Sequence, residues 1–183
     1  MFKELFPYEC AGSVFEIDYR KLYKKGIRGI IFDIDNTLVH HGDDSTPEID
    51  RLFRDIHDAG LKTLLLTNND EERVERFIKN IDTLYICDAE KPQPEGYRKA
   101  LKKLKLKKSQ AVCVGDQIFT DILGANRAGI PSILVKYIML PGETKIGKRR
   151  YAEKLILWYY RHTRYAHRLG DIIMRGGSSN AVE

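Results

Sequence analysis

The sequence GIIFDIDNT, residues 29–37, places an apolar run directly before two acidic residues. Residues 29–32 carry no polar side chain, as expected of a strand that is covered on both faces in a parallel sheet. Asp33 and Asp35 follow at once. Side chains two positions apart in extended backbone point to the same side, so we expect both carboxylates in one site. The stretch therefore predicts a buried strand that ends in a polar site.

Further apolar runs follow along the chain, and segments with helical character separate them. Strands are indicated at the runs LLL, LYIC, AVCV and SILV, which begin at residues 64, 84, 111 and 132. Helices are expected over Tyr19–Lys25, Pro47–Ala59, Asp70–Ile81, Pro94–Leu104 and Asp121–Ala128. This alternation predicts an α/β fold with a mainly parallel sheet. In such a sheet the ligand site lies beyond the carboxyl ends of the strands.

Polar residues at three further strand ends suit a phosphate and a cation. Asp116 stands at one strand tip, and Asp121 lies near the start of the helix that follows it. Thr67 and Asn68 end another strand and offer a hydroxyl and an amide to phosphate oxygens. Lys91 follows a third strand, where its charge would neutralise phosphate and restrain a nucleophile. The sequence thus predicts one site that is shared by four strand ends.

A cation is expected in this site, because carboxylates that lie close together repel each other unless a positive charge or a shared proton compensates. Mg²⁺ meets this need, since it binds a few carboxylates together with phosphate oxygens and water. The adjacent His40 and His41 are not expected to join it, because a hard cation prefers oxygen ligands. Taken singly, an Asp or Thr at a strand end can be a helix cap, and Lys91 a surface lysine. Their joint occurrence at successive strand ends favours a shared site.

These four elements, in this order, resemble the four motifs of the haloacid dehalogenase superfamily of phosphohydrolases. The correspondence is DxDxT at Asp33, Asp35 and Thr37, a strand-end Thr67, Lys91 before Pro92, and GDxxxxD with Asp116 and Asp121. The resemblance spans residues 28–135, well over half of the chain. It implies a Rossmannoid three-layer sandwich and the activity of a phosphoric monoester hydrolase.

The resemblance also implies a role for each residue. Asp33 would attack phosphorus and form an aspartyl-phosphate, while Asp35 would protonate the leaving oxygen and then activate water. Thr67, Asn68 and Lys91 would hold the phosphoryl group. The implied Mg²⁺ ligands are the carboxylates of Asp33 and Asp116 and the backbone carbonyl of Asp35, with Asp121 adjusting the site directly or through the other ligands.

The spacing of the motifs leaves no room for a cap domain. Asp35 and Thr67 are 32 positions apart, and Thr67 and Lys91 are 24 apart, which a flap, two helices and two strands consume. A capless enzyme has an open site that admits phospholipids, phosphoproteins or nucleic-acid ends, although an oligomer can still close the mouth around a small substrate. We expect a catalytic domain at 28–143, an N-terminal appendage at 1–27, a basic helical segment at 144–175 and a flexible tail at 176–183.

The net charge of +5 is concentrated near the C-terminus. Residues 145–175 carry nine Lys or Arg against two acidic residues, a local charge of +7 that leaves −2 for the rest. A helix over 150–169 would align one stripe of aromatic and aliphatic residues beside a basic face. The stripe comprises Tyr151, Leu155, Trp158, His162, Tyr165 and Leu169. Such a helix either lies on an anionic membrane or docks the stripe on its own domain, and both alternatives stay open.

The chain shows neither a signal peptide nor an apolar run long enough to span a bilayer, so we expect a cytoplasmic protein, with peripheral contact to the inner membrane face if the helix binds lipid. Cys10, Cys87 and Cys113 match no zinc spacing and are expected to be buried free thiols.

The runs FDIDNTLV and GDQIFTDILGANRAG, together with the basic aromatic C-terminus, resemble the YqeG family within subfamily IIIA of these phosphatases. That resemblance implies a phospholipid head-group phosphate, such as that of phosphatidylglycerophosphate, as the substrate. Two alternatives stay open. One is a soluble phosphatase for a nucleotide, a sugar phosphate or a phosphoprotein. The other, ranked last because no RNA-binding module is recognised, is a nucleic-acid or ribosome-binding protein with residual hydrolysis.

Overall fold

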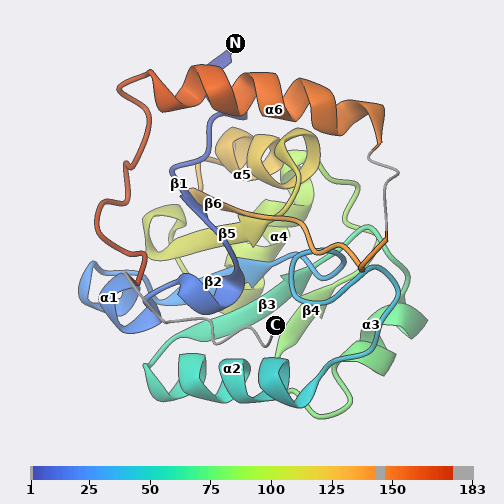
Figure 1. Ribbon diagram of the computed structural model, residues 1–183. Coiled ribbons are helices and arrows are strands. Elements are labelled where there is room, and N and C mark those ends of the chain that lie inside the picture. The colour runs from blue at the N-terminus through green and yellow to red at the C-terminus, as the bar shows by residue number, and fades with distance from the viewer. Residues whose placement is uncertain (1, 143–146, 175–183) are drawn as a thin grey trace.

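A computed structural model describes residues 2–142 and 147–174 (Figure 1). In this part of the chain six parallel strands form one sheet in the order β1-β6-β5-β2-β3-β4. The strands are β1 (Glu9–Ala11), β2 (Gly29–Phe32), β3 (Lys62–Leu66), β4 (Leu84–Ile86), β5 (Ala111–Gly115) and β6 (Ser132–Val135). The helices are α1 (Tyr19–Lys24), α2 (Pro47–Asp58), α3 (Glu71–Phe77), α4 (Pro94–Leu104), α5 (Leu123–Ala128) and α6 (Lys148–Arg161). Shorter turns are the 3₁₀ segments η1 (Phe2–Leu5), η2 (Val14–Glu16) and η3 (Lys108–Gln110) and the π-helical η4 (Ile118–Ile122).

The helices cover both faces of the sheet, as the alternation of strands and helices predicts. Buried side chains of α1, α2 and α3 form one core with one face, and those of α4 and α5 form a second core with the other. The central strands β2 and β5 are buried at every position, because helices lie above and below them. The expected α/β three-layer sandwich is confirmed.

The order of the strands places the polar site. From β2 the chain passes to β3 and β4 on one side, and then crosses to β5 and β6 on the other. Helices on either side of such a switch point diverge, which opens a crevice beyond the carboxyl ends of β2 and β5. Asp33 and Asp116 directly follow these two strands.

Local signals in the sequence account for the helix limits near the site. The hydroxyl of Thr46 accepts a hydrogen bond from the backbone N–H of Ile49, and Pro47 occupies the first turn of α2, where it leaves no additional donor unpaired. The helices predicted at 47–59 and 94–104 are confirmed within one residue. Asp70 is the N-cap of α3, which ends at Phe77 and is shorter than predicted.

The chain enters the sheet earlier than predicted. Residues 1–27 were expected to precede the first strand, but Glu9–Ala11 pairs with β6 as the edge strand β1. A hydrophobic pattern over only three residues is too short to predict a strand. The strand forms because its backbone pairs with β6. Only Cys113 of the three free cysteines is buried, whereas Cys10 and Cys87 are half-buried.

The C-terminal helix is also shorter than the predicted 150–169, because α6 ends at Arg161. The next residues are anchored on the N-terminal strand region: His167 Nδ1 lies 2.7 Å from Glu9 Oε1, and the backbone N–H of Arg168 bonds to the carbonyl of Tyr8 at 2.8 Å. These long-range contacts replace further helical turns. The predicted tail at 176–183 lies outside the described residues.

Helix α6 does not dock the predicted stripe. The face that packs on the domain carries Ile156, Leu157 and the buried Tyr160, which lie against η1, η4 and β6. Tyr151, Leu155 and Trp158 are 62%, 68% and 63% exposed. The docking alternative is therefore wrong for this part of the stripe. No helix of the described chain is long and apolar enough to cross a membrane.

Candidate active site

Three carboxylates meet beyond the ends of β2 and β5. Asp33, Asp116 and Asp121 each place a carboxylate oxygen within 4.8 Å of the others. The backbone N–H of Asp33 bonds to the carbonyl of Val114 at 3.0 Å, so sheet pairing continues into the site and holds its carboxylate beside β5. Asp121 lies in the π-helical turn η4 rather than in the first turn of the predicted helix. Three of the four predicted acidic residues are thus brought together.

Lys91 supplies a cation to this cluster. Its Nζ lies 2.5 Å from Asp33 Oδ1 and 2.7 Å from Asp121 Oδ1, and only 6% of its side chain is exposed. Burial alone would lower the pKa of Lys91, but the charges of Asp121 and Asp33 outweigh it and raise that pKa. Lys91 therefore stays protonated, and it engages one oxygen of Asp33.

The remaining negative charge in the cluster is not fully compensated. Burial raises the pKa of Asp33 to about 6, with Lys91 opposing and Asp121 adding to the effect. Burial, together with the charges of Asp121 and Asp33, raises the pKa of Asp116 to about 7, although the charge of Arg150 opposes this rise. Raised pKa values of neighbouring carboxylates indicate that an additional cation can bind between them, because its charge would stabilise their ionised forms.

Hydroxyl and amide groups complete the strand ends. Thr37 Oγ1 lies 3.4 Å from Asp33 Oδ2 and 3.3 Å from Asp116 Oδ1, so this buried hydroxyl bridges two carboxylates. Thr67 is buried and accepts the backbone N–H of Asn69 at 3.1 Å. Asn68 holds the Lys91 backbone, because its Oδ1 accepts the Lys91 N–H at 2.7 Å, and its binding of phosphate stays a prediction.

Asp35 lies apart from the carboxylate cluster. Its Oδ1 accepts the backbone N–H of Gly42 at 3.1 Å and a guanidinium N–H of Arg73 at 2.9 Å, while its Oδ2 accepts from Asn69 at 2.6 Å. Burial alone would raise the pKa of Asp35, but these hydrogen bonds and the charge of Arg73 lower it. Asn36 adopts a positive φ of 61° and turns the chain. The backbone at the motif is therefore not fully extended, and the prediction that Asp33 and Asp35 point into one site, which assumed an extended chain, holds only in part.

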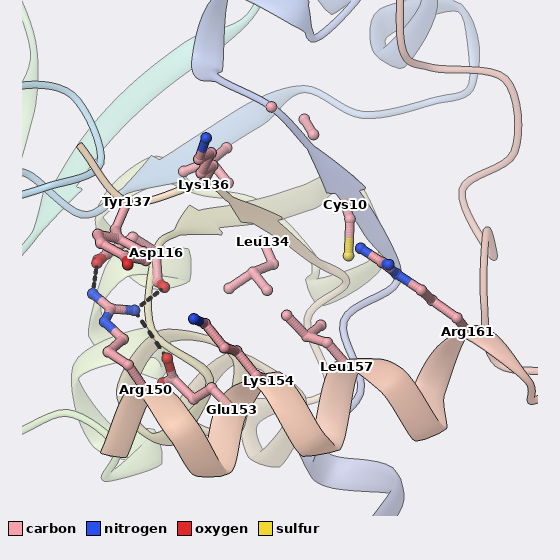
Figure 2. A pocket seen from close by; sticks show the side chains of 13 residues that line it. Cys10, Asp116, Leu134, Lys136, Tyr137, Arg150, Glu153, Lys154, Leu157 and Arg161 are labelled. Carbon is pink, nitrogen blue, oxygen red and sulfur yellow. Dashed lines mark hydrogen bonds and ion pairs between the residues drawn. The ribbon is translucent and has the colours of Figure 1, made fainter. Parts of the chain in front are cut away.

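Two cationic residues of this site carried no distinguishing signal in the sequence. Arg73 sits in a helix of mixed charge, and nothing in its spacing marks it. Arg150 reaches the site from α6: it forms an ion pair with Asp116 and also bonds to the Asp116 carbonyl at 2.6 Å (Figure 2). Its other partner is Glu153, at 3.0 Å. Of these contacts, only the i,i+3 pair of Arg150 and Glu153 could have been predicted from the sequence.

Glu153 fixes Arg150 and ties α6 to the active-site turn. Its Oε2 accepts from Arg150, and its Oε1 accepts the backbone N–H of Ile118 at 2.8 Å. The guanidinium of Arg150 also stacks on the ring of Tyr137, with its central carbon 4.5 Å from the ring centroid. The position of α6 is therefore coupled to the residues that follow β5.

The donor set fits a hard divalent cation. The cluster found among the described residues is composed of carboxylates alone and includes neither His40 nor His41. His41 Nδ1 instead lies 3.4 Å from Asp35 Oδ2. Oxygen ligands with excess negative charge are what Mg²⁺ and similar cations bind. The predicted ligands Asp33, Asp116 and Asp121 would hold it, and the role of the Asp35 carbonyl stays a prediction.

A buried lysine beside clustered carboxylates at the switch point of a parallel sheet is an arrangement suited to an enzyme that transfers phosphoryl groups. The family model for haloacid dehalogenase-like hydrolases matches residues 41–129, which include Thr67, Lys91 and both acidic residues after β5. The probable phosphatase YqeG of Bacillus subtilis is 37% identical over 137 residues, which cover 74% of this chain and 80% of that protein. The chain belongs to the haloacid dehalogenase-like hydrolase family and is a phosphatase of that family.

Other similar proteins agree with this placement. A putative pyrophosphatase PpaX of Caldanaerobacter subterraneus is 30% identical over 105 residues, 52% of this chain and 47% of that protein. Among solved structures, an uncharacterized protein from Listeria monocytogenes matches 74% of this chain and 99% of its own with a TM-score of 0.52 at 19% identity. A HAD phosphatase from Thermococcus onnurineus matches 72% and 98%, with a TM-score of 0.50 at 16% identity. The two structures support the fold.

Proposed function

We propose that the chain is a Mg²⁺-dependent phosphomonoester hydrolase that acts on a phospholipid head-group phosphate, such as that of phosphatidylglycerophosphate, through an aspartyl-phosphate on Asp33. The single observation that carries the catalytic part is the cluster of Asp33, Asp116 and Asp121 against buried Lys91. Lys91 binds Asp33 Oδ1, and the second carboxylate oxygen, which the Thr37 hydroxyl contacts at 3.4 Å, is the one proposed to attack.

In the first half of the reaction, Asp33 forms a bond to phosphorus while the ester P–O bond breaks on the opposite side. Lys91 and Thr67 neutralise and orient the transferring group. A cation held by Asp33, Asp116 and Asp121 would supply charge neutralisation and keep these carboxylates ionised. The leaving oxygen takes a proton from Asp35 and departs as an alcohol.

In the second half, water attacks phosphorus, gives its proton to Asp35 and releases inorganic phosphate and free Asp33. Asp35 has to be protonated at the start of the cycle, yet Arg73, Asn69 and Gly42 favour its ionised form. Substrate binding must therefore loosen this hold. Asp35 lies at a cavity of about 450 Å³ that reaches Arg73 and Asn68, where a leaving group can enter.

The lipid part of the proposal is supported by the outer face of α6. Tyr151, Leu155 and Trp158 form an exposed aromatic and aliphatic face on a basic helix. Tyr and Trp suit the level of lipid head groups, and Lys or Arg beside them attract anionic lipids. We propose that this face rests on an anionic membrane surface, and that the protein is peripheral to the cytoplasmic side.

The substrate test measures phosphate release from phosphatidylglycerophosphate in mixed micelles and from a panel of soluble phosphomonoesters and pyrophosphate. Each substrate is tested with Mg²⁺ and with EDTA, using wild type, Asp33→Asn and the matched control Asp58→Asn on the exposed end of α2. The proposal expects Mg²⁺-dependent release from the lipid that Asp33→Asn abolishes and Asp58→Asn retains. Release from soluble esters alone would keep the mechanism and reject the lipid. PpaX, named a pyrophosphatase, makes pyrophosphate a necessary member of the panel.

Membrane contact is tested separately, by co-sedimentation with vesicles of phosphatidylglycerol and phosphatidylcholine. Wild type should bind anionic vesicles in a salt-sensitive manner, and Trp158→Ala should weaken binding about tenfold, in line with one lost interfacial aromatic side chain. Phe15→Ala is the control, because Phe15 is 46% exposed but lies on η2, away from α6. Equal binding of all three proteins would refute this contact.

A further inference from the structure

The cavity beside Asp35 has a volume of about 450 Å³, and the loops after β2, β3 and β4 form its wall together with α3. Asp35, the proposed proton donor, belongs to this wall, as do Asn69 and Arg73. A leaving oxygen that takes a proton from Asp35 has to lie within hydrogen-bond distance of that carboxylate. The rest of the leaving group would therefore extend into this cavity.

Arg73 in the wall is buried, but its hydrogen bonds are incomplete. Its side chain is 10% exposed, and Nη2 donates to Asp35 Oδ1 at 2.9 Å and to the carbonyl of Asp43 at 2.7 Å. Nε and Nη1 are buried and have no acceptor among the described residues. The ring of Phe77, 5.6 Å from the central guanidinium carbon, supports the group but offers no oxygen. Buried donors without an acceptor are costly, so these N–H groups indicate an oxygen ligand.

The charges in the wall restrict which oxygen ligand fits. Asp35, Asp70 and Asp88 contribute carboxylates, which outnumber the guanidinium of Arg73. A leaving group that is itself an anion is disfavoured here, because the carboxylates repel it. A hydroxyl group suits both kinds of neighbour, since its oxygen accepts from a guanidinium and its hydrogen can be donated to a carboxylate.

We propose that this cavity is a leaving-group subsite for a polyol, and that Arg73 determines its specificity by donating a hydrogen bond to a hydroxyl group on the carbon next to the ester carbon. The assignment rests on the proposed function, because it concerns the leaving group of the same reaction. A rotation of the Arg73 side chain can turn Nε or Nη1 toward the cavity while Asp35 stays beside the ester oxygen. A free polyol phosphate and one that is linked to a lipid share this chemistry.

Esters that differ by one hydroxyl group test the subsite. α-Glycerophosphate has a hydroxyl group on the carbon next to the ester carbon, and its deoxy analogue lacks only this group. We expect wild type to have a kcat/KM at least about tenfold higher for α-glycerophosphate, because a site that binds a hydroxyl group discriminates against an analogue without it. A preference below about twofold in every pair that is hydrolysed would overturn the proposal.

A second pair distinguishes the two sources of the polyol. It consists of short-chain phosphatidylglycerophosphate and the analogue that lacks the same hydroxyl group. The preference for the hydroxyl group should appear in whichever pair the enzyme hydrolyses, and the higher kcat/KM identifies the free or the lipid-linked polyol as the better substrate.

Arg73→Gln separates recognition of the hydroxyl group from the contact with Asp35. Loss of that contact alters the rates of both esters in a pair, whereas loss of hydroxyl recognition alters their ratio. The preference should fall about tenfold in Arg73→Gln and stay unchanged in Arg76→Gln, a matched change on the same helix outside the cavity wall. A folded Arg73→Gln variant that retains the full preference would reject Arg73 as the specificity-determining residue.

Pyrophosphate tests the charge of the cavity, because its leaving group is an anion. We expect wild type to have a lower kcat/KM on pyrophosphate than on the preferred polyol ester, since the carboxylates of Asp35, Asp70 and Asp88 repel that leaving group. A higher kcat/KM on pyrophosphate would overturn the assignment of a polyol.

Binding without turnover distinguishes failure of this inference from failure of the proposed function. Calorimetry with Mg²⁺ compares both esters of each pair in Asp33→Asn, with and without Arg73→Gln. We expect about tenfold tighter binding of the hydroxyl-bearing ester, and loss of that difference in the double variant. Hydrolysis by wild type without any preference would reject the subsite and keep the proposed function. An Arg73-dependent binding preference, in a protein that hydrolyses no phosphomonoester, would reject the proposed function and keep a polyol site.

Discussion

The two acidic residues of the first motif meet contrasting environments. Asp33 is buried beside Asp116 and Asp121, where burial and like charge raise its pKa to about 6. Asp35 is partly exposed, and hydrogen bonds from Gly42, Arg73 and Asn69 lower its pKa. The residues are two positions apart in the chain. The difference shows that the pKa of each carboxylate is set by its surroundings in space rather than by its place in the motif.

This contrast is consistent with the proposed roles of the two carboxylates. An excess of buried negative charge suits the side that holds a cation and the nucleophile, because the metal stabilises what the protein alone does not. A carboxylate that is held by hydrogen bonds from movable partners suits proton transfer, because it has to change its protonation state in each cycle.

The largest expected effect on activity comes from substitution of the buried Asp33. Asp33→Asn keeps the shape but removes the nucleophilic oxygen charge, so kcat should fall at least about 10⁴-fold on every phosphomonoester that the enzyme hydrolyses. The measurement is steady-state phosphate release, with circular dichroism to confirm folding. Mass spectrometry of acid-quenched wild type should show a phosphate adduct on Asp33 that the variant lacks. A folded variant with more than a tenth of wild-type activity would refute the assignment.

Substitution of Asp35 should have a smaller effect, which depends on the leaving group. Asp35→Asn is expected to lower kcat about 10²–10³-fold on an alkyl phosphate, because the leaving alkoxide then departs without a proton. The loss should be smaller on p-nitrophenyl phosphate if the first step limits turnover, since nitrophenolate needs no proton. Pre-steady-state burst kinetics identify the limiting step. Equal losses on both esters under first-step limitation would contradict the role of Asp35 as the acid.

Removing the cation that holds Asp35 should shift the pH profile. Arg73 contributes to lowering the pKa of Asp35, so Arg73→Gln should raise that pKa. The first step needs protonated Asp35, and the descending limb of kcat/KM should therefore move to higher pH. Arg76→Gln is the matched control on the same helix, because Arg76 pairs with exposed Asp44 instead. A limb that stays in place would show that the Arg73 contact does not govern the proton donor.

The smallest effect is expected at the junction with α6. Arg150 binds the Asp116 carboxylate, which is a predicted metal ligand, so its guanidinium competes with a cation there. Arg150→Gln should tighten Mg²⁺ binding about three- to tenfold, as the loss of one partly screened charge implies. Calorimetric titration with Mg²⁺ checks this, with Arg149→Gln as the control. Weaker Mg²⁺ binding in a variant of unchanged thermal stability would show that Arg150 supports the metal site.

Most charged residues of the carboxylate cluster could be predicted, because local sequence patterns mark the ends of the strands that carry them. Buried strands are nearly pure apolar runs, and polar residues at their carboxyl ends stand out against them. Asp33, Asp116, Asp121 and Lys91 were found in this way, and they do lie together. The spacing between motifs also limited what can be inserted, which predicted a site without a cap.

Other contacts could not be predicted, because they join segments that are distant in the sequence. Arg73 and Arg150 lie on helices of mixed charge, and their acidic partners are 38 and 34 positions away. Strand β1 is too short to show a pattern. The length of α6 was overestimated because a helical period continues past Arg161, whereas contacts of His167 and Arg168 with the N-terminal region end the helix.

By itself, the sequence determined the class of fold and the strand ends at which the acidic residues and Lys91 gather, since hydrophobic pattern and motif spacing are properties of the chain. The tertiary structure decided which charges compensate one another. It separated Asp35 from Asp33, placed Arg150 on Asp116, and turned the aromatic face of α6 to the outside. Electrostatic interactions and packing depend on distances between side chains, and folding alone sets those distances.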